Sequence, residues 1–240
     1  MDLYYEHMGH LVLQGGGEFG GQMRASDSRA IALAGGYNAE LSIVPAAAAP
    51  DRNHHRAGQN GRRWFESLGA RNVNVLPLID RGSADNPVIA SHLRRSRLIY
   101  LLGGFPVYLA SVLQGTSSWE AICAALSRDA TVAGSSAGAM VMGSFFYDPV
   151  KQDVIKGLGI LPATCVIPHF NTFGRQWISR LQKELPWVTL IGIDEETGVI
   201  DDGPDGTWSV SGKGGAVLYR NHQIEEYGSG ERFDLYGASV

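Results

Sequence analysis

Two adjacent serines lie among small residues in the segment VAGSSAGAM, directly after a short apolar run. Residues 134–138 read GSSAG, which fits the pattern G-x-S-x-G with Ser136 at its centre. On a sharp strand-to-helix turn such a serine projects its hydroxyl group, and its neighbours two places away must be small because the backbone is crowded there. Ser136 is therefore a candidate nucleophile, and the N–H of Ala137 is a candidate donor to an oxyanion. The alternative is a plain turn in which a serine caps a helix.

A nucleophilic serine needs a neighbouring base, and the sequence contains seven histidines. His169 follows a β-type run and Pro168, which places it at the carboxyl end of an expected strand. Ligands gather at these ends in an open parallel sheet, so His169 is the candidate base. His222, in a polar stretch near the C-terminus, is a second candidate. The others are expected at the surface or near the N-terminus: His7, His10, His54, His55 and His92.

An acid that orients the base would complete such a site. The segment GIDEETG supplies three acids in a row after the next apolar run, namely Asp194, Glu195 and Glu196. Side chains alternate along an extended chain, so Asp194 and Glu196 would share one face and Glu195 would take the other. We expect one of the three to point into the site. The spacing alone does not choose between them.

Two glycine-rich segments follow other apolar runs. Gly103 and Gly104 would let backbone N–H groups approach a ligand, or they form a plain turn before a helix that begins at Pro106. Residues 15–20 match the dinucleotide fingerprint G-x-G-x-x-G. That fingerprint also needs an acid after the second strand, but Glu40 stands before this strand. Nucleotide binding is therefore disfavoured, and no spacing predicts a metal site or a cofactor.

These segments need a scaffold that brings strand ends together. Short apolar runs alternate with helical patterns, which is typical of a mostly parallel sheet with helices on both faces. We expect a three-layer α/β sandwich in one domain over residues 1–240, with residues 1–7 either native or a disordered, vector-derived tail. The expected strands are 11–14, 41–44, 73–76, 98–102, 131–133, 164–167 and 189–193. The expected helices are 24–34, 58–68, 106–113, 119–126, 137–142 and 175–185. Turn signals over 198–219 predict an antiparallel edge hairpin near the C-terminus.

The composition excludes several classes of protein. A net charge of −4, from 20 basic and 24 acidic residues, offers no basic surface for nucleic acid. No apolar run is long enough to span a membrane, and the N-terminus lacks the pattern of a signal peptide. Cys123 and Cys165 stand far apart, which argues against a disulfide framework and favours a reducing cytoplasm.

The order of these segments resembles the serine peptidases of the dipeptidase E and cyanophycinase family. GSSAGAM, GGF before it, PHF after it and then GIDEETG carry the resemblance, which covers nearly the whole chain. It implies a fold related to class I glutamine amidotransferases, with serine in place of cysteine. It also implies a triad of Ser136, His169 and Glu195, the glutamate that follows the aspartate of the I-D-E run. The N–H groups of Gly104 and Ala137 would then stabilise the oxyanion, and no cofactor is needed.

The sequence departs from this family where substrate would bind. Relatives commonly carry Asn or Gln after the paired glycines, where this chain has Phe105. They also carry several arginines after the H-F pair, where this chain keeps only Arg175. The expected substrate-binding residues are Gly103, Phe105, Asn171 and Arg175. The resemblance implies hydrolysis of a small peptide or isopeptide bond, in aspartyl dipeptides or in cyanophycin-like β-aspartyl substrates. It supports the hydrolytic chemistry better than the aspartyl specificity.

Two other functions remain open at this point. An α/β-hydrolase-type esterase would use the order serine, acid, histidine, which here gives Ser136, Asp194 or Asp201, and His222. A non-catalytic protein of the same fold would bind a small ligand and would show a serine without a base in reach. If the chain is a serine peptidase, its partner is a small peptide substrate, and we expect it to bind neither nucleic acid nor a membrane. The sequence does not decide between a monomer and a homodimer.

Overall fold

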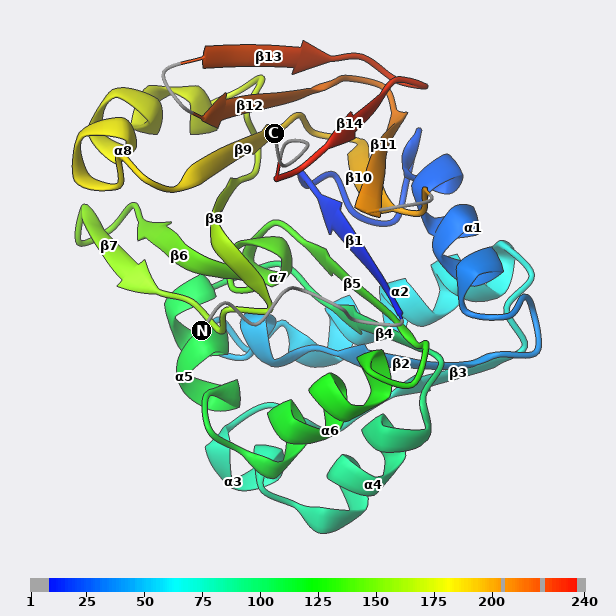
Figure 1. Cartoon of the computed structure of the whole chain (residues 1–240). Coiled ribbons are helices and arrows are strands. Elements are labelled where there is room, and N and C mark those ends of the chain that lie inside the picture. Colours follow the sequence, from blue (N-terminus) through cyan, green and yellow to red (C-terminus); the bar gives the residue numbers. More distant parts are fainter. Residues whose placement is uncertain (1–8, 204–205, 221–222, 237–240) are drawn as a thin grey trace.

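A mixed eight-stranded sheet forms the centre of the protein, whose computed structural model describes residues 9–203, 206–220 and 223–236 (Figure 1). Its strands are β1 (His10–Gln14), β2 (Glu40–Val44), β3 (Asn72–Val75), β4 (Leu98–Leu101), β5 (Thr131–Ser135), β10 (Thr197–Asp201), β11 (Thr207–Gly212) and β14 (Arg232–Asp234). They lie in the order β14-β11-β10-β1-β5-β4-β2-β3. Strands β1, β5, β4, β2 and β3 run parallel to one another. Strands β10, β11 and β14 each pair antiparallel with their neighbours. The mostly parallel sheet and the C-terminal hairpin, which is β10 and β11, are confirmed.

A second sheet of six strands packs against the first. Its strands are β6 (Gly143–Asp148), β7 (Asp153–Lys156), β8 (Leu161–Ile167), β9 (Thr189–Ile193), β12 (Ala216–Arg220) and β13 (Gln223–Tyr227), in the order β13-β12-β9-β8-β6-β7. The sequence predicts β8 and β9 as strands but assigns them to one common sheet, which is wrong. Apolar runs reveal that a segment is extended, whereas its neighbours in a sheet are set by contacts distant in sequence.

Helices cover both faces of the central sheet. The described helices are α1 (Met23–Leu33), α2 (His54–Ser67), α3 (Arg81–Ala84), α4 (Pro87–Arg95), α5 (Pro106–Leu113), α6 (Ser117–Leu126), α7 (Ala137–Met140) and α8 (Ile178–Glu184), with short 3₁₀ turns η1 (Ala46–Ala48) and η2 (Gly174–Trp177). Helix α8 contacts β9 of the second sheet. Among the described helices, none combines the length and the apolar content that crossing a membrane requires.

Alternating side chains of the central strands enter two separate cores. Val12 of β1 and Tyr100 of β4 join the core under α1 and α2, which also contains Ile31 and Phe65. Neighbouring strand residues, such as Leu11, face the opposite side and enter the larger core. This period of two is the expected pattern for a sheet buried on both faces.

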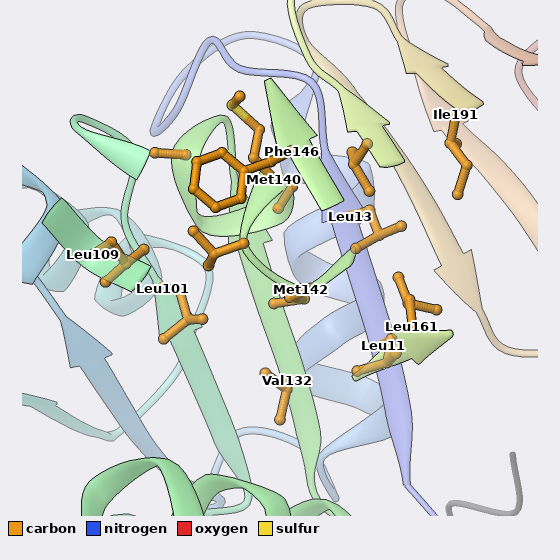
Figure 2. Packing of buried hydrophobic residues seen from close by; sticks show 14 of the residues in the cluster. Leu11, Leu13, Leu101, Leu109, Val132, Met140, Met142, Phe146, Leu161 and Ile191 are labelled. Atoms are coloured by element: carbon orange, nitrogen blue, oxygen red, sulfur yellow. The ribbon is translucent and has the colours of Figure 1, made fainter. Parts of the chain in front are cut away.

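The larger core joins the two sheets. Figure 2 shows Leu11 and Leu13 of β1, Leu101 of β4 and Val132 of β5 beside Met140, Met142, Phe146, Leu161 and Ile191. These last residues come from α7 and the chain after it, and from β6, β8 and β9. Burying one such side chain contributes about 1.5–3 kcal/mol, so this core fixes the second sheet against the first.

Candidate active site

Ser136 lies on the turn between β5 and α7, with φ 48° and ψ −112°. Residues other than glycine rarely adopt such a backbone conformation. The N–H of Ser136 donates to the carbonyl oxygen of Gln14 in β1 at 3.0 Å, which ties the turn to the neighbouring strand. Gly134 and Gly138 meet across the turn, where a Cβ on Gly134 would lie 2.5 Å from the carbonyl carbon of Gly138. The small residues two places to either side of Ser136 are thus required by packing.

His169 follows β8 in a tight turn and has a φ of 52°. Its carbonyl oxygen accepts the N–H groups of Thr172, Phe173 and Gly174 at 3.0, 3.1 and 2.9 Å. Its own N–H donates to the carbonyl oxygen of Gly15 at 2.8 Å. These four bonds stabilise an unusual backbone conformation and fix the direction in which the imidazole leaves the chain.

The imidazole of His169 connects the candidate nucleophile to an acid. Its Nε2 lies 2.9 Å from Oγ of Ser136, and its Nδ1 lies 2.7 Å from Oε1 of Glu195. With the proton on Nδ1 and donated to the carboxylate, Nε2 is left to accept the serine proton. Phe173 stacks on the ring at 4.8 Å between centroids, and Asn171 Oδ1 accepts the N–H of Glu195 at 3.0 Å. The structure therefore brings Ser136, His169 and Glu195 together.

The acids on either side of Glu195 have other partners. Oδ2 of Asp194 accepts the N–H of Gly215 at 3.0 Å. Glu196 accepts the N–H of Gln22 and pairs with Lys213, both at 3.2 Å, and these two contacts, the N–H first, lower the pKa of its carboxyl. Glu196 has a φ of 55°, so the chain is not extended there and the alternation expected from the sequence does not hold.

The residues of the esterase alternative are not brought together in the described part of the chain. Asp201 is at the far end of β10, where its carbonyl oxygen is 2.7 Å from Nδ1 of His10. That end of β10 lies opposite the end where β5 leads into Ser136. His222 and His7 lie outside the described residues.

The glycine-rich loop after β1 forms a wall of the site rather than a phosphate loop. Gly16 has a φ of +112°, and a Cβ there would collide with the imidazole of His169. The carbonyl oxygen of Gly16 accepts the N–H of Glu196 at 2.9 Å. The loop also contains Glu18, which the sequence analysis missed, although it is the only charged residue in the run GGGEFGG. Oε1 of Glu18 accepts the N–H of Gly103 at 2.6 Å, and the pKa of its carboxyl is raised to about 7, mainly by burial.

The expected substrate-binding residues occupy different surroundings. Phe105 is exposed, and its N–H donates to the carbonyl oxygen of Ala47 at 2.9 Å. The alanine tract after β2 forms the buried turn η1, against which Gly104 packs. Arg175 stacks over the ring of Phe170, 4.6 Å from its centroid. Within the described residues, no hydrogen bond or ion pair links Arg175 to the triad.

A buried polar network lies beneath the serine turn. Nε2 of Gln14 donates to Oδ1 of Asp27 at 2.7 Å, and Oε1 of Gln14 accepts the hydroxyl of Tyr100 at 2.6 Å. The indole N–H of Trp64 donates to Oδ2 of Asp27 at 2.7 Å. Burial is the main cause that raises the pKa of Asp27, to about 6. Since the backbone of Gln14 also holds Ser136, this network helps to fix the site from below.

Two surface hollows differ in their distance from the candidate active site. One, of about 390 Å³, borders the glycine-rich loop and is lined by Glu18, Phe19, Asn60, Arg63, Trp64 and Ser67. A larger one, of about 530 Å³, is lined by Arg94, Arg95, Ser96, Arg97, Ala125 and Arg128. Arg97 precedes β4 whereas Ser136 follows β5, so this larger hollow lies at the opposite ends of the strands. The contacts among the side chains, rather than hollow size, locate the candidate active site.

Comparison with known proteins gives consistent matches. Residues 11–205 match the model of peptidase family S51. The chain is 31% identical over 197 residues to the cyanophycinase of Trichormus variabilis, and the alignment covers 77% of this chain but only 64% of the relative's length. It is 29% identical over 237 residues to the cyanophycinase of Synechococcus elongatus, which covers 89% and 70% of the two chains. The crystal structure of a peptidase from an acI-B1 Actinobacterium superposes with a TM-score of 0.82 at 29% identity, over 97% of this chain and 100% of the other.

Proposed function

The chain belongs to peptidase family S51, and from this premise we propose that it is a serine peptidase that hydrolyses small peptide or isopeptide bonds. The observation that carries the proposal is the continuous contact from Ser136 through His169 to Glu195, at 2.9 and 2.7 Å. The names of its curated relatives suggest the substrate class. We propose aspartyl dipeptides or β-aspartyl bonds of the cyanophycin type.

The proposed reaction has two halves. Oγ of Ser136 attacks the substrate carbonyl carbon while Nε2 of His169 accepts the hydroxyl proton. The tetrahedral intermediate collapses, the C–N bond breaks, and His169 gives its proton to the leaving amine. A water molecule then attacks the acyl-enzyme, with His169 again as the base, and releases the carboxylic acid and Ser136. Glu195 orients the imidazole and stabilises its cation in both halves.

Two backbone N–H groups are proposed to stabilise the oxyanion. Gly104 lies in the loop after β4, and Ala137 directly follows Ser136. Within the described residues, neither N–H donates to another backbone or side-chain acceptor, which supports this role. Removing one such donor typically lowers kcat by about 10²–10³-fold.

The triad assignment is tested by substitution. Ser136→Ala is expected to lower the hydrolysis of α- and β-aspartyl dipeptides by about 10⁴-fold or more, because the triad acts as a unit. His169→Ala should be equally damaging. Ser135→Ala should cost far less than Ser136→Ala, and His222→Ala should have a mild effect. Most activity surviving in Ser136→Ala would reject the nucleophile, and a reversed ranking of the two histidines would favour the esterase.

A cytoplasmic location is also part of the proposal. Cys123 and Cys165 are both unpaired, and burial raises the pKa of both thiols, that of Cys165 to about 12. Unpaired thiols fit a reducing compartment. Fractionation of the source cells tests this, and recovery of the protein outside the cytoplasm would contradict it.

A further inference from the structure

The carboxyl group of Glu18 lies beside Ser136 and has no part in the reaction described above. Its Oε1 accepts the N–H of Gly103 at 2.6 Å. A Cβ placed on Gly103 would lie 2.6 Å from this oxygen and 3.3 Å from Cβ of Ser136. The carboxyl group and the serine therefore flank the same side of Gly103.

The segment 103–105, which contains the proposed oxyanion donor, is held at two points. On one side, the N–H of Phe105 donates to the carbonyl oxygen of Ala47 at 2.9 Å, and Gly104 packs against the same carbonyl with a φ of +137°. On the other side, the only hydrogen bond of the Gly103 N–H within the described residues is the one to Glu18. The hold on the side of Ser136 thus depends on one carboxyl group.

We infer that Glu18 is a positioning residue, whose carboxyl group holds Gly103 so that the N–H of Gly104 can receive an oxyanion formed at Ser136. The inference rests on the proposed function and extends it. Glu18 acts through Gly103 and does not touch the reacting atoms. In Glu18→Gln the amide oxygen can still accept the N–H of Gly103, so only the charge is lost. In Glu18→Ala both the charge and the hydrogen bond are lost.

The surroundings of Glu18 bring its ionisation into the neutral range. Burial has the largest effect on the pKa of the Glu18 carboxyl and raises it, as does the charge of Asp27. The N–H of Gly103 and the hydroxyl of Ser135 lower this pKa, and the result is about 7. A charged acceptor forms a stronger hydrogen bond than a neutral one, so the hold on Gly103 should strengthen as the pH rises through 7. The titratable and charged groups around the carboxyl are Asp27 from α1, Tyr100 from β4, Arg63 from α2 and, across Gly16, His169 after β8.

The test compares Glu18→Ala and Glu18→Gln with the wild type. The readouts are the rate at which a fluorophosphonate modifies Ser136, and kcat and KM for a β-aspartyl dipeptide, all between about pH 5.5 and 9. Glu18→Ala is expected to lower the modification rate and kcat by about 10–100-fold with little change in KM, because a misplaced donor loses part of its effect. Glu18→Gln should retain most of the rate and should differ from the wild type mainly in how the rate changes around pH 7.

Asp148→Asn is the matched control. Asp148 is a buried acid that, like Glu18, accepts backbone N–H groups, those of Val150 and Lys151, but it lies at the end of β6. Its substitution should leave the modification rate and its pH profile unchanged. Circular dichroism melting of every variant shows which of them fold, and if Glu18→Ala does not fold, Glu18→Gln decides.

A readout without activity separates this inference from the proposed function. In ¹⁵N-labelled protein the Gly103 amide signal should titrate with a midpoint near pH 7, and this titration should vanish in Glu18→Gln. A Gly103 signal that is the same in the wild type and in Glu18→Ala would overturn the inference, as would unchanged rates in Glu18→Ala or a rise in KM alone. If Ser136→Ala leaves hydrolysis intact, the proposed function fails, whereas the comparison of the Gly103 signals still decides whether Glu18 holds the segment.

Discussion

At the scale of single residues, the three consecutive acids after β9 show how neighbours acquire different tasks. Asp194 holds Gly215, Glu195 holds the imidazole of His169, and Glu196 holds Gln22 and Lys213. Each side chain thus connects the same short segment to a different part of the fold. Only the middle acid can stabilise a cation that forms on His169 during a reaction.

This difference predicts unequal effects of two otherwise identical substitutions. Glu195→Gln should lower kcat by about 10³–10⁴-fold, because an amide neither orients the imidazole in the same tautomer nor stabilises its cation. Glu196→Gln should change kcat only a few-fold, since its amide oxygen can still accept the N–H of Gln22 and an exposed ion pair contributes little. Steady-state kinetics on one dipeptide compares them. Equal losses would remove Glu195 from the triad.

Phe105 leads to a prediction about specificity. Phe105 is 46% exposed directly after Gly104, the proposed oxyanion donor, and its ring offers no hydrogen bond to a substrate carboxylate. Apolar contact contributes about 1–3 kcal/mol with whichever apolar group it meets. We therefore expect a peptidase with some preference for aspartyl groups, through Arg175, and tolerance of apolar ones. Phe105→Asn should shift the Asp-over-Leu ratio of kcat/KM toward Asp by about tenfold, or ~1.4 kcal/mol.

The measurement uses dipeptide amides with Asp, Asn, Leu or Phe on the acyl side. Trp187→Asn is the control, because Trp187 is also exposed but precedes β9, at the end of that strand away from His169 and Glu195. Wild-type discrimination for Asp over Leu above about 10⁴ would mean that unidentified polar groups replace those that the relatives use. In that case Phe105→Asn should do little.

At the scale of elements, the loop after β1 demonstrates how a short segment serves the site without chemistry of its own. Gly16→Ala should lower kcat by about 10²-fold or more, because a Cβ there would displace the imidazole of His169 and a φ of +112° disfavours alanine. Gly20→Ala is the matched control in the same loop, since its Cβ would meet nothing within 4 Å. Similar kinetics for both variants would show that His169 tolerates the displacement. Circular dichroism checks that both fold.

The elements also reveal what the sequence could predict. The expected helix at 106–113 agrees in full with α5, because Pro106 starts it and an apolar run continues it. No bounds are assigned to helix α4 in the sequence analysis, although the signals for its start are local: Asn86 caps it and Pro87 begins it. The hairpin of β6 and β7 and the separate second sheet could not be read from periodicity, because pairing depends on distant segments.

The candidate site likewise contains residues that local sequence signals identify and residues that depend on distant segments. Ser136 and His169 could be identified because each follows an apolar strand at the edge where ligands gather. Glu195 could be chosen only through the family resemblance, since the alternation argument fails where Glu196 leaves the extended conformation. Glu18 was missed because its role depends on Gly103, 85 residues away.

At the scale of the whole molecule, the site is assembled from two sheets. The order β1-β5-β4 places the glycine-rich loop, Ser136 and Gly103 side by side, whereas β8 and β9 of the second sheet supply His169 and Glu195. Two backbone bonds help to hold this arrangement, from the N–H of His169 to Gly15 and from that of Phe170 to Ile193. The larger core, which joins the two sheets, therefore also helps to keep His169 beside Ser136.

Two acids under the site, the buried Asp27 and the half-buried Glu18, predict how the stability of the whole fold depends on pH. The pKa of Asp27 is raised from 3.8 to about 6 and that of Glu18 from 4.5 to about 7, mainly by burial. At a pH between the unfolded and the folded pKa of each acid, the folded protein binds more protons than the unfolded chain. The free energy of unfolding therefore falls as the pH rises from about 4 to 7. The contribution of Asp27, which is fully buried, is on the order of 2–3 kcal/mol.

Denaturant unfolding at pH 5 and pH 8 checks this, with Asp27→Asn as the variant. The asparagine can be accommodated if the amide of Gln14 turns over and the hydroxyl of Tyr100 then accepts its N–H, so the network keeps its hydrogen bonds. Asp27→Asn should therefore reduce the loss of stability between the two pH values. Glu225→Gln is the control, because the pKa of Glu225 is lowered, chiefly by Arg220, and this acid is ionised at both pH values. It should shift stability equally at pH 5 and pH 8. A wild type that is more stable at pH 8, with Asp27→Asn showing the same slope, would mean that Asp27 ionises without penalty in the folded protein.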